Sequence, residues 1–141
     1  DETQKRKFRW VSSADYKDGC RAEGWTHLSG DSHDKMIIIT EGPMKADVIH
    51  CLTGLTVLAV PGVNTLTQLT KTLSKLKENG LKEVKTAFDM DFSINLHVQN
   101  GFNNLLSLLD DMNLKYGTYI WDSRYKGLDD YVWECLMHKK R

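Results

Sequence analysis

The sequence predicts an α/β fold with a four-stranded parallel sheet and helices on both of its faces. The alternation of two kinds of segment favours this fold. Short runs of β-branched and other apolar residues alternate with longer segments in which apolar residues recur every three or four positions. Such alternation is typical of β-α-β units, whose crossover helices cover both faces of a parallel sheet. We expect residues 35–141 to form this domain and residues 1–34 to form an N-terminal extension.

The predicted strands are short, and turn signals separate them from the segments that follow. "MIIIT" at residues 36–40 is a β-branched run that fits a buried strand. "TVLAV" at residues 56–60 leads directly into a Pro-Gly turn signal. "EVKTAF" at residues 83–88 and "KYGTYIW" at residues 115–121 are the third and fourth runs. Together they supply the strands of the predicted sheet.

Four predicted helices follow these strands. They start at Pro43, after a cap at Asn64 or Thr65, at Ser93 and at Lys126. Gly54 and Gly80 end the first two helices. We expect Cys51, on the first helix, to be a buried thiol. The apolar faces of the first three helices are Met44, Val48, Ile49 and Leu52; Leu66, Leu69, Leu73 and Leu76; and Ile94, Val98, Phe102, Leu105, Leu109 and Met112. The last helix carries Leu128, Tyr131, Val132 and Cys135.

The N-terminal extension has a different pattern. "KFRWVSS" at residues 7–13 and "WTHLSG" at residues 25–30 are typical of two short strands. The loop-like segment "DYKDG" lies between them. We expect a hairpin-like extension that Trp10 and Trp25 anchor on the core.

Acidic residues lie where the predicted strands end. Glu41 follows the first strand, and Asp89 and Asp91 follow the third. The carboxyl ends of neighbouring parallel strands form the ligand-binding edge of such a sheet, so these three carboxylates are expected to converge there. Carboxylates held close together repel one another, and a divalent cation removes that penalty. Hard oxygen ligands favour Mg²⁺ or Mn²⁺.

Other roles for these charged residues remain open. Aspartates after strands often occupy turns or cap the next helix. Asp129 and Asp130 lie in the first turn of the last predicted helix. There they either interact favourably with the helix dipole or hold a second metal ion. Asp122 fits a residue that ends the fourth strand and has no chemical role. Lys45 is either a solvated lysine or a ligand for a phosphate at the start of the first helix.

The ordered motifs "IIITEGPMKADVI", "VLAVPGV" and "TAFDMDF" resemble the pattern of a Toprim domain. This catalytic module is shared by bacterial-type primases, type IA and type II topoisomerases, OLD-family nucleases and recombination-mediator proteins. The chain is most similar to the Toprim-like domains of phage and mobile-element replication proteins, from "FRWVSS" to "WDSRYKGLDDYV". The resemblance places the catalytic glutamate on Glu41 and the Asp-x-Asp motif on Asp89 and Asp91, with Mg²⁺ or Mn²⁺ as cofactor.

The resemblance implies metal-dependent phosphoryl transfer on DNA, with nucleotidyl transfer in primer synthesis as the leading reaction. Two alternatives remain open: a nuclease similar to the OLD family, and a non-catalytic module that binds DNA or a partner protein. We expect nucleotides and single-stranded DNA as ligands, and a helicase or other replication domain in the same chain or complex.

Charge and composition limit these expectations. Lys plus Arg and Asp plus Glu number 19 each, so the formal net charge is zero and any contact with nucleic acid must be local. Arg124 and Lys126, in the loop after the fourth strand, are the favoured basic cluster. The cysteines are odd in number and widely spaced, which predicts reduced thiols and a cytoplasmic protein. No run of apolar residues is long enough for a membrane span.

Overall fold

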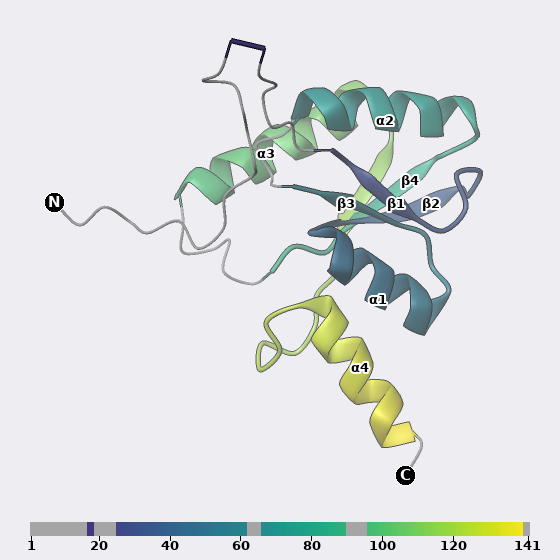
Figure 1. The fold of residues 1–141 in the computed structure, drawn as a ribbon, viewed down its shortest axis with the longest axis vertical. Coiled ribbons are helices and arrows are strands. Elements are labelled where there is room, and N and C mark those ends of the chain that lie inside the picture. The colour runs from purple at the N-terminus through teal and green to yellow at the C-terminus, as the bar shows by residue number, and fades with distance from the viewer. Residues whose placement is uncertain (1–16, 19–24, 62–65, 90–95, 140–141) are drawn as a thin grey trace, which may run out of the picture.

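A five-stranded mixed β-sheet forms the centre of the computed structural model (Figure 1). The structure describes residues 17–18, 25–61, 66–89 and 96–139. The strands are β1 (His27–Ser29), β2 (Met36–Glu41), β3 (Val57–Val60), β4 (Glu83–Thr86) and β5 (Lys115–Thr118). Their order in the sheet is β1-β3-β2-β4-β5. All four strands predicted for the parallel sheet are present, and the structure ends the last two before the predicted boundaries.

The predicted four-stranded, fully parallel sheet is wrong in one respect. Strands β2, β3, β4 and β5 pair in parallel, as expected, but β1 adds a fifth strand that runs antiparallel to β3. In this pair His27 lies opposite Ala59 and Ser29 lies opposite Val57. β1 comes from the segment predicted as an extension, and it covers a strand edge that would otherwise expose unpaired backbone groups.

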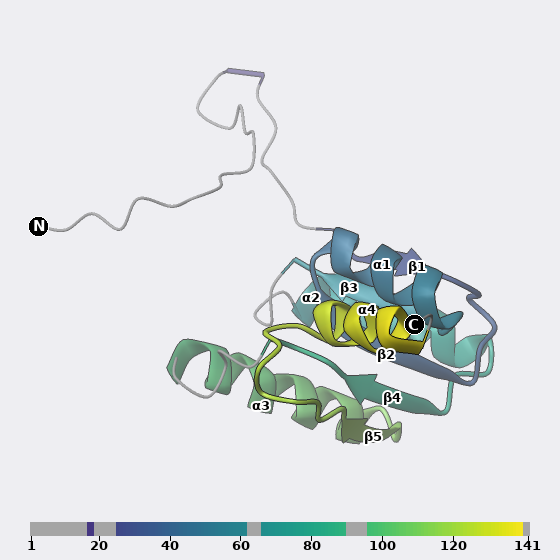
Figure 2. The ribbon, with the colours of Figure 1, turned by 90° about the horizontal axis from the view of Figure 1, so that it is seen from below.

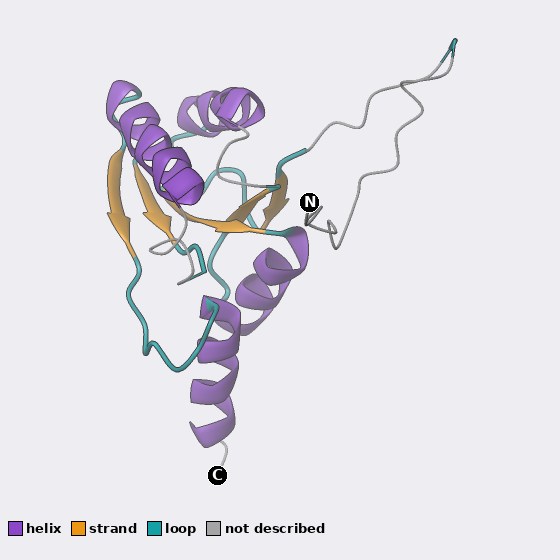
Figure 3. Cartoon of the chain, turned by 90° about the vertical axis from the view of Figure 1, so that its left-hand side faces the viewer, coloured by secondary structure: helices purple, strands orange, loops and turns teal. Residues whose placement is uncertain are grey.

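Two pairs of helices cover the two faces of the sheet (Figures 1 and 3). The helices are α1 (Pro43–Thr53), α2 (Leu66–Glu78), α3 (Leu96–Asp111) and α4 (Leu128–Lys139). α2 and α3 lie on one face, and α1 and α4 lie side by side on the other (Figure 2). Helices on both faces were predicted, and the arrangement confirms an α/β fold.

The central strand β2 supplies both layers of the core. Ile37 and Ile39 belong to the hydrophobic cluster beneath α2 and α3, whereas Ile38 belongs to the cluster beneath α1 and α4. All three side chains are at most 1% exposed. Successive side chains of a strand point to opposite faces, so an uninterrupted apolar run fits a strand that is covered on both sides.

The apolar face predicted for α1 is partly wrong. Met44 is 81% exposed and Val48 is 39% exposed, whereas the buried residues of this helix are Ala46 and Ile49. Apolar residues occur all around α1, so the sequence pattern does not identify its inner face. Helix α1 packs against β3 and α4 through the stripe that contains the small side chain of Ala46.

Two further expectations about burial are also wrong. Cys51 is exposed on α1, so it is not a core thiol. Trp25 is 69% exposed and does not anchor the N-terminal segment. The inward residues predicted for α2 and α3 are confirmed where the structure describes them. Those that are buried are Leu69, Leu73, Leu76, Leu105 and Leu109, and those that pack against their cluster are Leu66, Phe102 and Met112.

Some predictions fall on residues outside the described ranges. They concern Asp91, Trp10, the strand predicted at residues 7–13, the helix cap at Asn64 or Thr65, and the side chains of Ile94 and Val98. Within the described part of the chain, no helix combines the length and apolar character needed to cross a membrane.

Candidate functional site

The carboxyl ends of β2 and β4 bring Glu41 and Asp89 together. The two strands are direct neighbours, with Ile39 opposite Thr86. The chain after β4 continues along β2, because the Ala87 N–H donates to the Ile39 carbonyl at 2.8 Å and the Thr40 hydroxyl donates to the Ala87 carbonyl at 2.9 Å. Two residues later, the Asp89 N–H donates to Glu41 Oε1 at 3.3 Å. The predicted convergence is therefore present for this pair.

Lys45 supplies the positive charge at this point of the sheet. Its ammonium group forms an ion pair with Asp89 Oδ1, and its Nζ lies 3.8 Å from Glu41 Oε1. Gly42 has a φ of 80°, and Pro43 occupies the first turn of α1. A left-handed φ is readily available only to glycine, and here it turns the chain from β2 into α1. The lysine four residues after Glu41 can then reach back to the end of the strand.

The start of α4 closes the other side of the site. A Cβ on Gly127 would clash with Asp129 Oδ1 and would lie 3.2 Å from Asp89 Oδ1. Both carboxylates therefore lie close to the Gly127 backbone, which has space for them only because glycine has no side chain. The Oδ1 atom of Asp129 is buried and has no hydrogen-bond partner among the residues that the structure describes. Buried polar atoms usually have a hydrogen-bond partner, so this oxygen is available to a cation or to a hydrogen-bond donor.

Burial and like charges perturb the acids of this site. Burial, followed by the nearby Asp89 carboxylate, raises the pKa of Glu41 above its usual range. Burial, followed by the charge of Asp130, raises the pKa of Asp129. Lys45 opposes both shifts. Lys45 therefore interacts with one acid from β2, one from the segment after β4 and one from α4. We call these three residues, Glu41, Asp89 and Asp129, the acidic cluster.

The side chains fit a divalent metal ion in chemistry, although they are not arranged as a complete set of ligands. Carboxylate oxygens are the ligands that Mg²⁺ prefers, and Asp129 Oδ1 has no hydrogen-bond partner within the described ranges. Within the described ranges, no group of three or more His, Cys, Asp or Glu side chains lies close enough to hold a metal ion. Asp91 lies outside those ranges, and Lys45 contacts the two acids that a metal ion would need.

The remaining predicted site residues lie apart from this contact. Asp130 is exposed on the first turn of α4 and acts on Asp129 through its charge. Arg124 makes a two-pronged ion pair with Asp122, with its Nε and Nη2 at 3.0 and 2.7 Å from Asp122 Oδ2. This ion pair lowers the pKa of Asp122. Lys126 is exposed in the same loop. The two basic residues therefore lie in the expected loop, with the charge of Arg124 balanced by Asp122.

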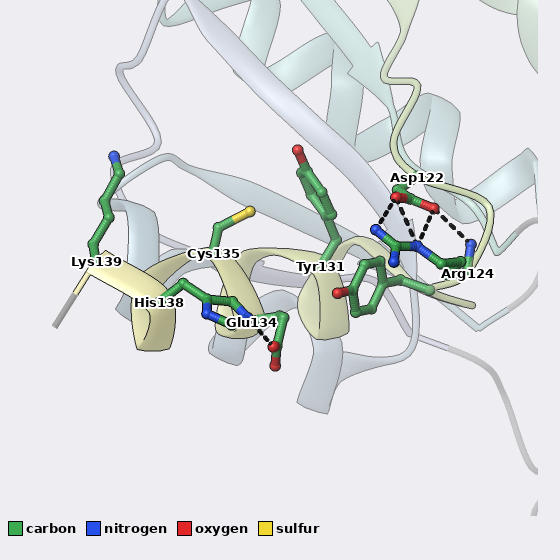
Figure 4. Close-up of a pocket in the computed structure, with 8 residues that line it drawn as sticks. Asp122, Arg124, Tyr131, Glu134, Cys135, His138 and Lys139 are labelled. Carbon is green, nitrogen blue, oxygen red and sulfur yellow. Dashed lines mark hydrogen bonds and ion pairs between the residues drawn. The ribbon is translucent and has the colours of Figure 1, made fainter. Parts of the chain in front are cut away.

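A groove along α4 was not predicted from the sequence. It has a volume of about 610 Å³, and Asp122, Arg124, Tyr125, Tyr131, Glu134, Cys135, His138 and Lys139 line it (Figure 4). The exposed thiol of Cys135 lies between Tyr131 and His138 along the helix. The sequence carries no specific signal for this groove, because its α4 positions mix polar residues with Tyr131 and Cys135.

The family comparison covers most of the chain. A family model described as "Domain of unknown function (DUF3854)" matches residues 25–136. The chain belongs to the DUF3854 family. The matched range contains all three residues of the acidic cluster and Lys45, so the site lies within the DUF3854 domain. Neither the search of curated proteins nor the search of solved structures gave a match.

Proposed function

We propose that this DUF3854 domain is a Toprim-like catalytic domain that performs metal-dependent phosphoryl transfer on DNA. The observation that carries the proposal is the contact between Glu41 and Asp89 at the carboxyl ends of two neighbouring parallel strands. Ligand sites of open α/β sheets lie at this edge. The resemblance of the motifs around both residues to a Toprim domain favours nucleotidyl transfer in primer synthesis.

Asp89 and Asp91 are the proposed metal ligands, and Glu41 is a further ligand or a general acid–base. The acidic cluster supplies oxygen donors, and the orphaned Asp129 Oδ1 supports its assignment to a cation. A bound Mg²⁺ would neutralise phosphate charge and orient the attacking or leaving oxygen. Burial raises the pKa of Glu41, which is the direction that a general acid–base at this position requires.

Basic side chains in the loop between β5 and α4 would position the nucleic acid. Arg124 and Lys126, in the loop between β5 and α4, provide local positive charge in a chain without net charge. Arg124 is 78% exposed, so its guanidinium group can exchange Asp122 for a phosphate. A nuclease would use the same groups, because both reactions transfer a phosphoryl group. The reaction products therefore separate the two activities.

The proposal is tested with the 141-residue chain, a single-stranded template, nucleoside triphosphates and Mg²⁺ or Mn²⁺. We expect primer products from the wild type, and we expect Asp89→Asn and Glu41→Gln to reduce the rate by at least about a hundredfold. Asp111→Asn is the control, since Asp111 is exposed at the end of α3 and lies outside the acidic cluster. Shortened template in place of primer would identify a nuclease, and neither product would identify a non-catalytic module.

A further inference from the structure

Lys45 lies in the position of a counter-ion within the acidic cluster. Its Nζ pairs with Asp89 and lies 3.8 Å from Glu41 Oε1. The Asp89 side chain is only 12% exposed and that of Lys45 is 30% exposed. A carboxylate so far removed from water requires a paired positive charge, and Lys45 provides it.

We propose that Lys45 is a built-in counter-ion that holds the acidic cluster together without metal and that must leave Asp89 before a divalent cation binds. This inference rests on the proposed function, because it concerns the regulation of the same site. Asp89 Oδ1 accepts the Lys45 ammonium group directly, so that oxygen is not free for a metal ion while the ion pair persists. A divalent cation and the ammonium group would also repel each other at this separation.

The position of Lys45 on α1 allows this exchange. The lysine lies in the first turn of the helix and its stem has four methylene groups, so the ammonium can move away while the backbone of α1 stays in place. Lys45 forms ion pairs with Asp89 and Glu41, and its charge also opposes the rise in the pKa of Asp129. Removal of this charge should therefore strengthen metal binding, in contrast to removal of a ligand.

The test measures Mn²⁺ binding by calorimetry at low ionic strength, where electrostatic competition is least screened. Lys45→Met removes the charge and keeps the length of the side chain. We expect it to increase Mn²⁺ affinity about fivefold, which corresponds to about 1 kcal/mol. Lys45→Arg keeps the charge and should remain within about twofold of the wild type.

Lys85→Met is the matched control. Lys85 is 32% exposed and also forms an ion pair, with its Nζ 2.9 Å from Glu83 Oε1, but it lies on β4 before the acidic cluster. If the gain at Lys45 were a general effect of net charge, Lys85→Met would show it too. A gain confined to Lys45→Met supports the inference, and an equal gain in both variants overturns it.

A second readout covers the case in which Lys45→Met folds poorly. Lys45→Gln can still donate a hydrogen bond to Asp89 but carries no charge. Saturating Mn²⁺ should raise its melting temperature more than it raises that of the wild type. An equal or smaller rise, or Mn²⁺ affinity that is unchanged or weaker in Lys45→Met, overturns the inference.

The outcomes for Lys45 and for the proposed function are distinguishable. If Asp89→Asn abolishes Mn²⁺ binding while Lys45→Met leaves it unchanged, the metal site stands and the counter-ion role is wrong. If neither the wild type nor Lys45→Met binds Mn²⁺, both proposals are wrong.

Discussion

The backbone N–H of Asp89 donates a hydrogen bond to Glu41 Oε1 at 3.3 Å, although 48 positions separate the two residues in the chain. The contact exists because β2 and β4 are adjacent parallel strands that end at the same edge of the sheet. It gives the DUF3854 domain a pair of acids with fixed relative positions. Lys45 adds its charge to this pair, and four predictions follow from these and neighbouring contacts.

The ion pair between Lys45 and Asp89 should stabilise the metal-free protein. We expect Lys45→Met and Asp89→Asn each to lower the free energy of unfolding by about 1 kcal/mol, because each leaves a partly buried charge without its partner. The double variant should lose less than the sum of the two. Chemical denaturation in the presence of a chelator measures all four proteins. Strictly additive losses would mean that the two side chains do not interact in solution.

Gly127 should tolerate no larger residue. Gly127→Ala places a Cβ against Asp129 Oδ1 and 3.2 Å from Asp89 Oδ1, so either the start of α4 or the acids must move. We expect a loss of about 1–3 kcal/mol in the free energy of unfolding. Gly117→Ala is the control, because its Cβ would meet only the flexible end of the Lys85 side chain. Similar stability for both alanine variants would contradict the close approach at Gly127.

Asp47 should make stability depend on pH at the edge of the sheet. The Ser29 hydroxyl, and then His27, lower the pKa of Asp47 by hydrogen bonding. For a carboxyl with a depressed pKa, the stabilisation is present above its pKa in the unfolded chain, about 4. It is lost as the pH falls through the lower folded value.

The variant Asp47→Asn should therefore melt at a lower temperature than the wild type at pH 7. The difference should shrink as the pH decreases from about 4. Thermal unfolding followed by circular dichroism across this range provides the measurement. A difference that stays constant with pH would show that the charge of Asp47 is not responsible.

The loop between β5 and α4 should contribute to the binding of single-stranded DNA. We expect the Arg124→Ala/Lys126→Ala double variant to weaken binding and to decrease the salt dependence by roughly one ion per lost phosphate contact. Lys71→Ala/Lys75→Ala removes the same charge from α2, on the other face of the sheet, and serves as the control. Fluorescence anisotropy over a range of salt concentrations is suitable. An unchanged salt slope in the loop variant would exclude this loop from the binding surface.

The sequence predicted the strands, the helices and the convergence of Glu41 with Asp89, because these depend on strong local patterns and on general rules for parallel sheets. The antiparallel addition of β1 was not predictable in the same way. The short strand predicted at residues 25–30 is present as β1, but so short a strand carries no signal for its partner, which is the open edge of β3. The fold class was therefore predicted more accurately than the composition of the sheet.

The details of the site were less predictable. The contact of Lys45 with Asp89 depends on the backbone turn at Gly42, and the approach of Asp129 depends on the missing side chain of Gly127. Neither feature has a periodic signature. The exposure of Met44 and Cys51 has a similar cause, because α1 has apolar residues on several sides and only its neighbours in the fold select the buried stripe.

The three isoleucines of β2 fix the register of this strand in the sheet. Ile37 and Ile39 face one layer and Ile38 faces the other, so a shift of β2 by one residue would exchange their faces throughout the strand. The same shift would move Glu41 away from Asp89. Packing of the interior therefore also maintains the spacing of the acids. Substitutions at the surface of this domain can leave the relative positions of Glu41 and Asp89 unchanged.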